Sequence, residues 1–331
     1  MTSTSTTFVT GGTGFLGRHL IPALCRSGHD VRVLARQPED HAWLKRYPNV
    51  EIVRGDVLDA ACVKEAARGC DYIVHAAGYF RFWGEQAVFD ATNVVGTENV
   101  LKAASDAKRV IHVSTIALIG TPTGVVDETH PANPTDNYQR SKYRAEQLAL
   151  NYGVPVIVLR PGAFYGPLGS YAFNRLFFRD PMRGIIMQIN GGSYITFPAY
   201  IADVAQAIVR SFDHGRTGEI YNICGESLTH KAAFDIICRE AHLWYPRLNI
   251  PGWLGESFAR FLTLLASVTG HEPFYPVTLR SYVYNDWRVT SEKAKRELGF
   301  VPTSFEEGAR RTIAWYRAGQ PETIEEVEGQ V

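Results

Sequence analysis

The sequence predicts an α/β protein with a doubly wound (Rossmann) parallel sheet and a smaller, mainly helical C-terminal substrate lobe. First, short β-rich runs alternate with helical patterns from residue 6 to about residue 160, which indicates parallel strands covered by helices on both faces. Second, a glycine-rich turn follows the first of these runs. Third, the alternation ends after Arg160, where Pro, Gly and aromatic residues become frequent.

The glycine-rich turn is the sequence Thr10-Gly-Gly-Thr-Gly-Phe-Leu-Gly17, between a predicted strand and a predicted helix. At such a turn, backbone N–H groups and the helix dipole attract a dinucleotide pyrophosphate. We expect Gly11 to allow the tight turn, Gly14 to let the backbone approach the pyrophosphate, and Gly17 to let the helix pack closely on the strand. An ordinary βα turn is the alternative, but the strand and helix around it favour binding.

The predicted strands of the sheet are short runs rich in β-branched and other apolar residues, at 7–10, 30–35, 50–54, 71–75, 109–114 and 155–160. Helices are predicted between them at 15–27, 59–69, 85–104 and 138–152. The Rossmann domain therefore comprises residues 1–160. A helix near 202–213 and a strand at 219–222 complete it, within about residues 201–224.

The substrate lobe is predicted from about residues 161–200 and 225–331. Its predicted helices begin near Thr229, at Trp253, at Ser291 and at the capping box Ser304-x-x-Glu307. In the helix at 253–268, the apolar residues fall on one face, namely Trp253, Phe258, Phe261, Leu262 and Leu265. We expect this face to be buried against the same protein. A peripheral membrane contact is the alternative, and it is not favoured.

The end of the second strand predicts the choice of cofactor. An acidic residue there would bind the ribose 2′-hydroxyl of NAD, whereas an arginine suits the 2′-phosphate of NADP. The strand ends in Ala35-Arg36, without an acidic residue, so NADP(H) is favoured and NAD(H) remains the alternative. Arg36 is otherwise a solvated surface charge. Asp56 ends the third strand and is expected beside the adenine, or as the cap of the following helix.

Tyr138 and Lys142 lie four residues apart, so on a helix both project from one face. A free tyrosine has a pKa of about 10, which is high for proton transfer at neutral pH. A positive charge about 4 Å away supplies on the order of 4 kcal/mol at an effective dielectric of about 20, so Lys142, helped by the cation of the oxidised nicotinamide, is expected to lower the pKa of Tyr138. Thr115, at the end of the preceding strand, can position a substrate oxygen. A surface Tyr/Lys pair is the alternative, and Tyr143 is a rival phenol.

Composition excludes several other classes. Thirty-four basic and thirty-four acidic residues leave no net charge, which gives no electrostatic case for nucleic acid. The five cysteines are scattered and odd in number, as in a cytoplasmic protein with reduced thiols. The ten histidines form no metal-binding spacing, so no metal is predicted.

The chain resembles the extended short-chain dehydrogenase/reductases, the NAD-dependent epimerase/dehydratase group, from Thr7 to about Arg317. Eight stretches carry the likeness in order: Thr10–Gly17, Gly55-Asp56, His75-Ala-Ala-Gly78, Asn93-Val-Val-Gly-Thr97, Val113–Gly120, Tyr138-x-x-x-Lys142, Arg160–Pro167 and Lys293–Phe300. The resemblance implies that Thr115, Tyr138 and Lys142 are catalytic. It also implies a homodimer through the helices near 85–104 and 138–152.

The same resemblance implies further cofactor contacts. Ala76, Ala77 and Gly78 are expected to line the cofactor, and Pro161 and Phe164 to flank the nicotinamide. The set is completed by residues inside or beside the matching motifs, namely Phe15, Leu16, Val57 and Asn93.

Within the group, the chain looks most like the dihydroflavonol-reductase-type aldehyde/ketone reductases and the hopanoid-associated sugar-epimerase-like proteins. The loop Tyr79-Phe-Arg-Phe-Trp83 carries that likeness. Members that act on nucleotide sugars often have an arginine where this chain has Thr196, which weakens a nucleotide-sugar assignment. Arg280 or Arg288 remains a candidate replacement for that cation.

The predicted function is hydride transfer between NADP(H) and a carbonyl or secondary alcohol of a small, fairly apolar substrate. Candidate substrate contacts are Tyr79, Phe82, Trp83, Phe164, Tyr165 and Thr196, although the aromatic residues could instead pack in a core. The alternatives are an NAD-retaining epimerase or dehydratase of sugars or nucleotide sugars, and a non-catalytic NADP-sensing module.

Overall fold

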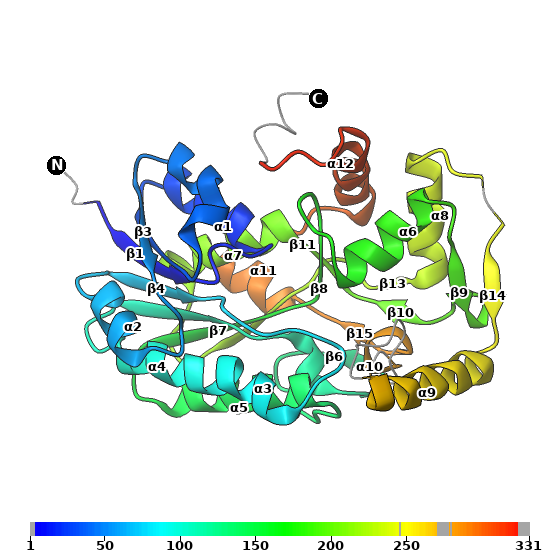
Figure 1. The fold of residues 1–331 in the computed structure, drawn as a ribbon, viewed down its shortest axis with the longest axis horizontal. Coiled ribbons are helices and arrows are strands. Elements are labelled where there is room, and N and C mark those ends of the chain that lie inside the picture. Colours follow the sequence, from blue (N-terminus) through cyan, green and yellow to red (C-terminus); the bar gives the residue numbers. More distant parts are fainter. Residues whose placement is uncertain (1–3, 245, 270–277, 279, 324–331) are drawn as a thin grey trace.

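The computed structural model describes residues 4–244, 246–269, 278 and 280–323. Seven parallel strands form its central sheet, in the order β12-β7-β5-β4-β1-β2-β3 (Figure 1). They are β1 (Thr6–Thr10), β2 (Asp30–Ala35), β3 (Val50–Arg54), β4 (Tyr72–His75), β5 (Arg109–Val113), β7 (Val156–Pro161) and β12 (Ile220–Ile223). The strand order reverses between β1 and β4, where such sheets bind ligands. The predicted doubly wound sheet is confirmed.

Helices cover both faces of this sheet (Figure 1). One face carries α1 (Gly17–Arg26), α7 (Ile201–His214) and α11 (Glu292–Leu298), and the other carries α2 (Ala60–Ala67), α3 (Gln86–Asp90), α4 (Gly96–Lys102) and α5 (Asn137–Asn151). Successive strand residues point to opposite faces. Phe8 and Val9 of β1 are both fully buried and therefore belong to two different hydrophobic cores.

Two predicted helices differ from expectation. The first begins at Gly17, two residues late, because residues 11–16 are used by the turn. The helix expected at 85–104 is divided into α3, the π-helical segment η2 (Ala91–Val95) and α4. Such π-helical segments frequently occur at functional sites, and η2 carries Asn93.

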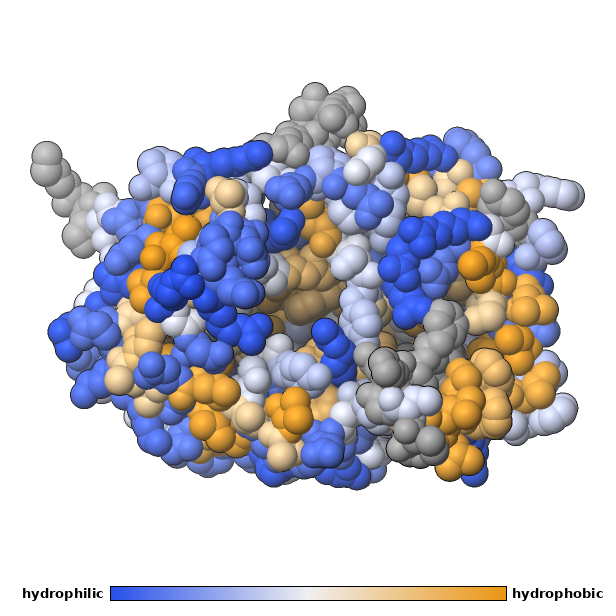
Figure 2. All heavy atoms as spheres, viewed as in Figure 1, coloured by the Kyte–Doolittle hydropathy of each residue, from blue (hydrophilic) through white to orange (hydrophobic). Residues whose placement is uncertain are grey.

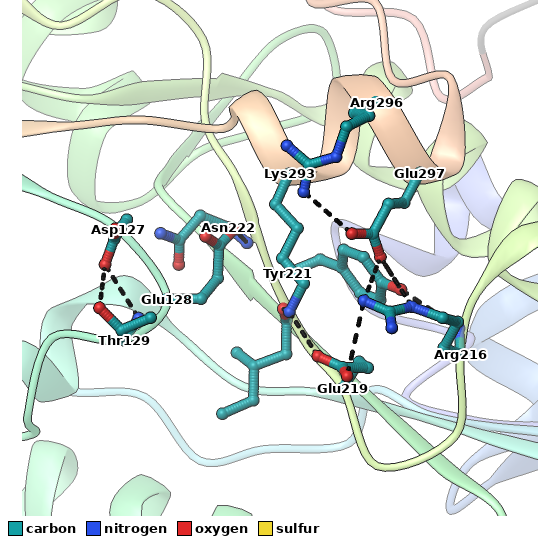
Figure 3. Close-up of polar contacts among 11 residues, drawn as sticks. Asp127, Glu128, Thr129, Arg216, Glu219, Tyr221, Asn222, Lys293, Arg296 and Glu297 are labelled. Atoms are coloured by element: carbon teal, nitrogen blue, oxygen red, sulfur yellow. Dashed lines mark hydrogen bonds and ion pairs between the residues drawn. The ribbon is translucent and has the colours of Figure 1, made fainter.

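Hydrogen bonds and ion pairs join α11 to residues in and just before the edge strand β12 (Figure 3). Lys293 Nζ donates to Glu219 Oε2 at 2.7 Å, and the Tyr221 hydroxyl donates to Glu297 at 3.0 Å. Arg216 Nε also donates to Glu297, at 3.0 Å. Lys293 Nζ also donates to the backbone carbonyl of Ile220 at 2.7 Å, which satisfies one backbone group of this edge strand.

The second part of the molecule, called the C-terminal lobe here, lies beside the carboxyl ends of the strands (Figure 1). Its helices are η4 (Asn174–Arg179), α6 (Asp180–Met182), η5 (Asn190–Gly192), α8 (His230–Glu240), α9 (Gly252–Thr269), α10 (Arg280–Val283) and α12 (Phe305–Arg317). The Thr229 and Ser304 side chains cap α8 and α12, as the sequence predicts.

Four short strand pairs, none of them predicted, join the lobe to the sheet or hold it together. They are β6 (Val125–Val126) with β15 (Arg288–Val289), β8 (Ala163–Tyr165) with β11 (Pro198–Tyr200), β9 (Met187–Ile189) with β14 (Leu248–Ile250), and β10 (Ile195–Thr196) with β13 (Leu228–Thr229). Two 3-10 segments, η1 (Pro38–Arg46) and η3 (Ile116–Ile119), follow β2 and β5.

The apolar face of α9 is exposed, which contradicts the expectation that it is buried. Trp253, Phe258 and Phe261 are 71%, 54% and 57% exposed, and Leu265 is 45% exposed. The helix turns small residues toward the protein instead, so large ones face outward. Figure 2 shows the resulting apolar surface over α9, at the lower right. Among the described residues, no helix is long and apolar enough to cross a membrane.

Candidate active site

A cavity of about 770 Å³ runs from the glycine-rich turn to the C-terminal lobe. The carboxyl ends of β1, β4, β5 and β7 supply one wall, and aromatic residues of the lobe supply much of the other. On the face shown in Figure 2, the molecule is hollowed near the middle, with apolar residues inside the hollow. The position matches the crevice predicted from the strand order.

The glycine-rich turn shapes one end of this cavity. Gly11 has φ +74°, and a Cβ there would lie 2.5 Å from the carbonyl carbon of Ala76, so no other residue fits. A Cβ on Gly17 would overlap the backbone of Gly12, which explains how α1 begins directly on the turn. Gly14 faces the cavity, where its bare backbone lets a ligand approach closely.

The start of α1 is suited to an anion. Its first turn contains no acidic residue, and no side chain caps its N-terminus. Phe15, Leu16 and Arg18 line the cavity at this end. Free N–H groups and the helix dipole there favour phosphates, so these residues fit the pyrophosphate of a dinucleotide.

The loop after β4 lies against this turn. Ala76 and Gly78 line the cavity, whereas Ala77 packs against the hydrophobic core beneath it. Asn93, which is 1% exposed, does not reach the cavity. Its amide accepts from Tyr79 N at 2.7 Å and donates to the Ser141 hydroxyl at 2.8 Å. Asn93 therefore ties the loop to α5, which is a positioning contact.

Three residues predicted to bind the cofactor lie away from the cavity wall. Arg36 is exposed at the end of β2. The Asp56 carboxylate accepts from Leu58 N at 3.0 Å, and Asp59 is the residue that caps α2. Val57 is 7% exposed and packs in the core next to α4. Val57 therefore packs in the core beneath the loop after β3 and does not line the cavity. Arg36 and Asp56 remain candidates for contact with the adenosine of the cofactor.

Thr115, Tyr138 and Lys142 come together in the cavity wall. Thr115 follows β5, while the other two lie one turn apart on α5. The Thr115 hydroxyl lies close enough to the Tyr138 phenol to influence its ionisation. Lys142 Nζ donates to the carbonyl of Val113 at 2.7 Å. The predicted phenol, hydroxyl and ammonium thus share one site.

Burial is the largest cause of the pKa shifts of Tyr138 and Lys142. It raises the pKa of Tyr138 above its usual range, and the hydrogen bond with Thr115 lowers it by less. Burial also lowers the pKa of Lys142 to about 8, opposed by the nearby Glu146 carboxylate. Burial therefore opposes the lowering expected from the cations of Lys142 and the oxidised nicotinamide. Desolvation disfavours the phenolate, so Tyr138 keeps its proton at neutral pH.

A buried ion pair supports the helix that carries the catalytic candidates. Arg160 donates to Glu146 through Nη2 at 2.5 Å and Nε at 3.0 Å. The Ser114 hydroxyl donates to the same carboxylate at 2.7 Å. Because Glu146 lies one turn beyond Lys142, these bonds fix α5 against β5 and β7.

The substrate end of the cavity is aromatic. Phe80 packs edge-on against Tyr138, with ring centroids 4.7 Å apart. Phe82, Tyr171 and Tyr282 surround Phe80 and also line the cavity. Phe82 was predicted as a substrate contact. The other three were missed: Phe80 and Tyr171 lie in loops, and Tyr282 lies in the four-residue helix α10, which is too short for a periodic signal of the direction in which a side chain points.

The remaining predicted contacts divide into two groups. Thr196, Pro161 and Phe164 line the cavity. Tyr165 does not, because β8 directs it into the lobe core, where it is 1% exposed. Its assignment as a substrate contact is therefore corrected to core packing.

Two residues of the predicted aromatic loop also fail to reach the cavity wall. Tyr79 packs on Phe89, with ring centroids 5.2 Å apart, and Trp83 is half-buried outside the wall. Their assignment as substrate walls is corrected accordingly. The loop contributes to the wall through the residues between them.

The C-terminal segment reaches the cofactor end of the cavity, which the sequence did not predict. Trp315, Gln320, Pro321 and Glu322 line the cavity opposite the glycine-rich turn. Arg18 Nη1 donates to the carbonyl of Glu322 at 3.0 Å.

Cations are few at the substrate end. Among the described residues, Arg81 is the arginine that lines the cavity there, with its guanidinium over the Tyr79 and Tyr171 rings. Arg288 donates to the carbonyl of Ser227 instead, and the side chain of Arg280 lies outside the described residues. No group of residues in the described ranges is arranged to hold a metal ion.

Comparison with known proteins agrees with this geometry. The model of the "NAD dependent epimerase/dehydratase family" matches residues 7–224. A 4-hydroxy-2-methyl-3-oxo-4-farnesyl-3,4-dihydroquinoline-1-oxide ketoreductase of Stigmatella aurantiaca is 33% identical, with 89% of this chain and 91% of that protein covered.

Two further proteins extend the comparison. Sterol demethylase protein B of Methylococcus capsulatus is 30% identical, with 94% of this chain and 98% of that protein covered. A dTDP-glucose 4,6-dehydratase of Streptomyces venezuelae, solved with NAD and TYD bound, superposes with a TM-score of 0.77 at 26% identity, covering 97% of this chain and 99% of that one.

Proposed function

The chain belongs to the NAD-dependent epimerase/dehydratase family and is an NAD(P)-dependent enzyme, and we propose that it is an NADP(H)-dependent reductase of apolar ketones or aldehydes. The observation that carries the proposal is the contact of Tyr138 with both Thr115 and Phe80. It places a proton donor between a polar positioning group and an apolar wall.

The bound nicotinamide would supply the hydride in the reductive direction. Thr115 and Tyr138 would orient the substrate oxygen through their hydroxyl groups, and Tyr138 would donate the proton to it. Lys142 would hold the ribose hydroxyls and provide the positive charge that stabilises the phenolate after transfer. A Tyr138 pKa above the usual range keeps the phenol protonated at neutral pH, which suits reduction.

An apolar substrate is supported by the character of the cavity's substrate end. Phe80, Phe82, Tyr171 and Tyr282 form its wall, and Thr196 lies where nucleotide-sugar enzymes often carry an arginine. A buried pyrophosphate needs cationic partners. The names of two relatives, one with a farnesyl dihydroquinoline substrate and one in sterol demethylation, fit this choice.

The preference for NADP(H) rests on Arg36. It ends β2 and is exposed, so its guanidinium is available to a 2′-phosphate. No acidic residue stands at the end of β2 to bind a 2′-hydroxyl in its place.

The division of labour and the assembly are also proposals. Residues 1–160 and about 201–224 would bind the cofactor, and about 161–200 and 225–331 the substrate. A homodimer would form through α3, η2, α4 and α5, where Val88 of α3 and Val95 of η2 leave apolar side chains exposed at 47% and 46%. We place the enzyme in the cytosol, which suits its free cysteines.

A second candidate is a nucleotide-sugar epimerase or dehydratase that retains NAD. The similarity to a dTDP-glucose 4,6-dehydratase favours it, as does Arg81, whose position at the substrate end could serve a diphosphate.

A substrate panel discriminates the two. NADPH oxidation should follow addition of aldehydes or ketones with apolar bodies, and UDP- or dTDP-sugars should neither be turned over nor raise the melting temperature. Stabilisation by a UDP- or dTDP-sugar at micromolar concentration, lost in Arg81→Ala, would establish the second candidate.

A further inference from the structure

The helix α9 presents its large apolar side chains to solvent and its small ones to the protein. Gly255, Ala259 and Ala266 are buried on its inner side. The outer side carries residues that are between 45% and 71% exposed: Trp253, Leu254, Phe258, Phe261, Leu264 and Leu265. A helix that served only to cover a core would have the opposite arrangement.

The apolar surface continues onto the neighbouring strand pair. Leu248 in β14 and Ile185 before β9 are 60% and 56% exposed, and Leu248 N donates to the carbonyl of Ile186 at 2.9 Å. We call Leu248, Ile185 and the outer side of α9 the α9 surface. Figure 2 shows apolar residues gathered over α9, at the lower right, and such an exposed patch marks an interaction site.

The helix α9 itself carries little charge. The helix contains one acidic and one basic residue, Glu256 and Arg260, and they pair with each other at 2.7 Å. Its partner must therefore be attracted by apolar area and not by electrostatic complementarity. Tryptophan, phenylalanine and leucine on one helical face are typical of helices that lie in the interface of a bilayer.

The inner side of α9 lies close to the substrate end of the cavity. A Cβ on Gly255 would lie 2.8 Å from the Tyr284 hydroxyl, so α9 touches the segment after α10. Tyr282 and Val283, the two residues before Tyr284, line the cavity. An apolar molecule dissolved in a bilayer that touched α9 would be close to the site where it reacts.

We propose that the α9 surface docks the enzyme on a lipid bilayer, with α9 parallel to the membrane plane, and that the cavity receives its substrate from the lipid. The docking rests on the surface alone, whereas the delivery of substrate rests on the proposed reduction of apolar carbonyl compounds. A second copy of the chain is a less suitable occupant, because such interfaces have a polar rim with hydrogen bonds, and this surface offers one internally satisfied charge pair.

Flotation of the purified full chain with phosphatidylcholine vesicles tests the docking. The wild type should float with these uncharged vesicles and continue to do so in ~1 M salt, because screening does not weaken apolar contact. Trp253→Ser/Phe258→Ser/Phe261→Ser should lower the partition coefficient at least about tenfold, since binding scales with buried apolar area. Val125→Ser/Val301→Ser, which removes side chains 66% and 78% exposed elsewhere, is the matched control and should float normally.

The possible results distinguish a failure of membrane docking from a failure of the proposed function. Wild-type protein that stays out of the lipid fraction overturns docking, as does a dimer that the triple variant dissociates, or binding that requires anionic lipid. A cooperative thermal transition shows whether the triple variant is folded, and if it is not, Phe261→Ser alone replaces it. If flotation behaves as expected while no apolar carbonyl compound is reduced, the proposed function fails and the docking surface stands.

Discussion

Arg160 and Glu146 form a buried two-point ion pair, with side chains 4% and 0% exposed and N–O distances of 2.5 and 3.0 Å. It joins β7 to the helix that carries Tyr138 and Lys142. Removing one partner would leave the other charge buried without compensation, which typically costs about 3–5 kcal/mol. We therefore expect Arg160→Met to lower the free energy of unfolding by that amount in urea titration.

The exposed pair Arg54–Glu39, with side chains 64% and 58% exposed, is the matched control. Arg54→Met should change the free energy of unfolding by less than about 1 kcal/mol. The double change Arg160→Met/Glu146→Leu should recover most of the loss, because neither charge then remains buried. Equal small effects of Arg160→Met and Arg54→Met would contradict the buried ion pair.

Lys142 should make stability depend on pH in the alkaline range. Its pKa is lowered from 10.5 to about 8 in the folded state, so between these values the unfolded chain binds more protons and stability rises with pH. The folded state is penalised by on the order of 3 kcal/mol below pH 8, and the penalty disappears above the unfolded value. The stability difference between Lys142→Met and the wild type should therefore shift in favour of the wild type from pH 7 to pH 10. A constant difference over that range would contradict a charged, buried Lys142.

Phe80 should determine how bulky apolar substrates bind. Because its ring packs on Tyr138 in the cavity wall, Phe80→Ala should raise KM for large apolar ketones by about tenfold or more, as expected for a lost aromatic contact of about 1.5–3 kcal/mol. Trp83→Ala, in the same loop but outside the wall, is the control. Similar kinetics for the two variants would argue against this wall as the substrate site.

Arg36 should determine the choice of cofactor. A charged hydrogen bond to the 2′-phosphate would favour NADPH over NADH by about ten- to a hundredfold, and Arg36→Ala should remove most of that preference. Arg68→Ala, at an exposed position at the end of α2, should leave it unchanged. Equal Kd values for the two cofactors in the wild type would instead support the NAD-retaining epimerase.

The sheet and the grouping of Thr115, Tyr138 and Lys142 at one site were predictable from strand spacing and from the four-residue interval on α5. Gly17 is required by a backbone contact within the turn itself, and Tyr138 and Lys142 are one turn apart on α5. The sequence could not reveal which way an amphipathic helix faces. The periodicity of α9 correctly predicted which side chains share one face. Whether that face points outward depends on tertiary contacts, such as the close approach of Gly255 to Tyr284.

The sequence also could not show where an aromatic side chain of the lobe points, or how strongly burial changes a pKa. Tyr165 points into the core because β8 pairs in parallel with β11, a contact without a sequence signal. The expectation for the Tyr138 pKa considered nearby positive charge without the desolvation that the surrounding protein imposes on the phenolate.

The most direct test of the account is the rate of NADPH oxidation with an apolar ketone by Tyr138→Phe and, as its control, Tyr143→Phe, the neighbouring phenol on α5. Tyr138→Phe keeps the ring but removes the proton, so kcat should fall by about 10²–10⁴, the usual contribution of general acid–base catalysis, with little change in the Kd for NADPH. Tyr143→Phe should retain nearly all activity. Near-normal turnover by Tyr138→Phe would contradict the assignment of Tyr138 as the proton donor, and with it the proposed mechanism.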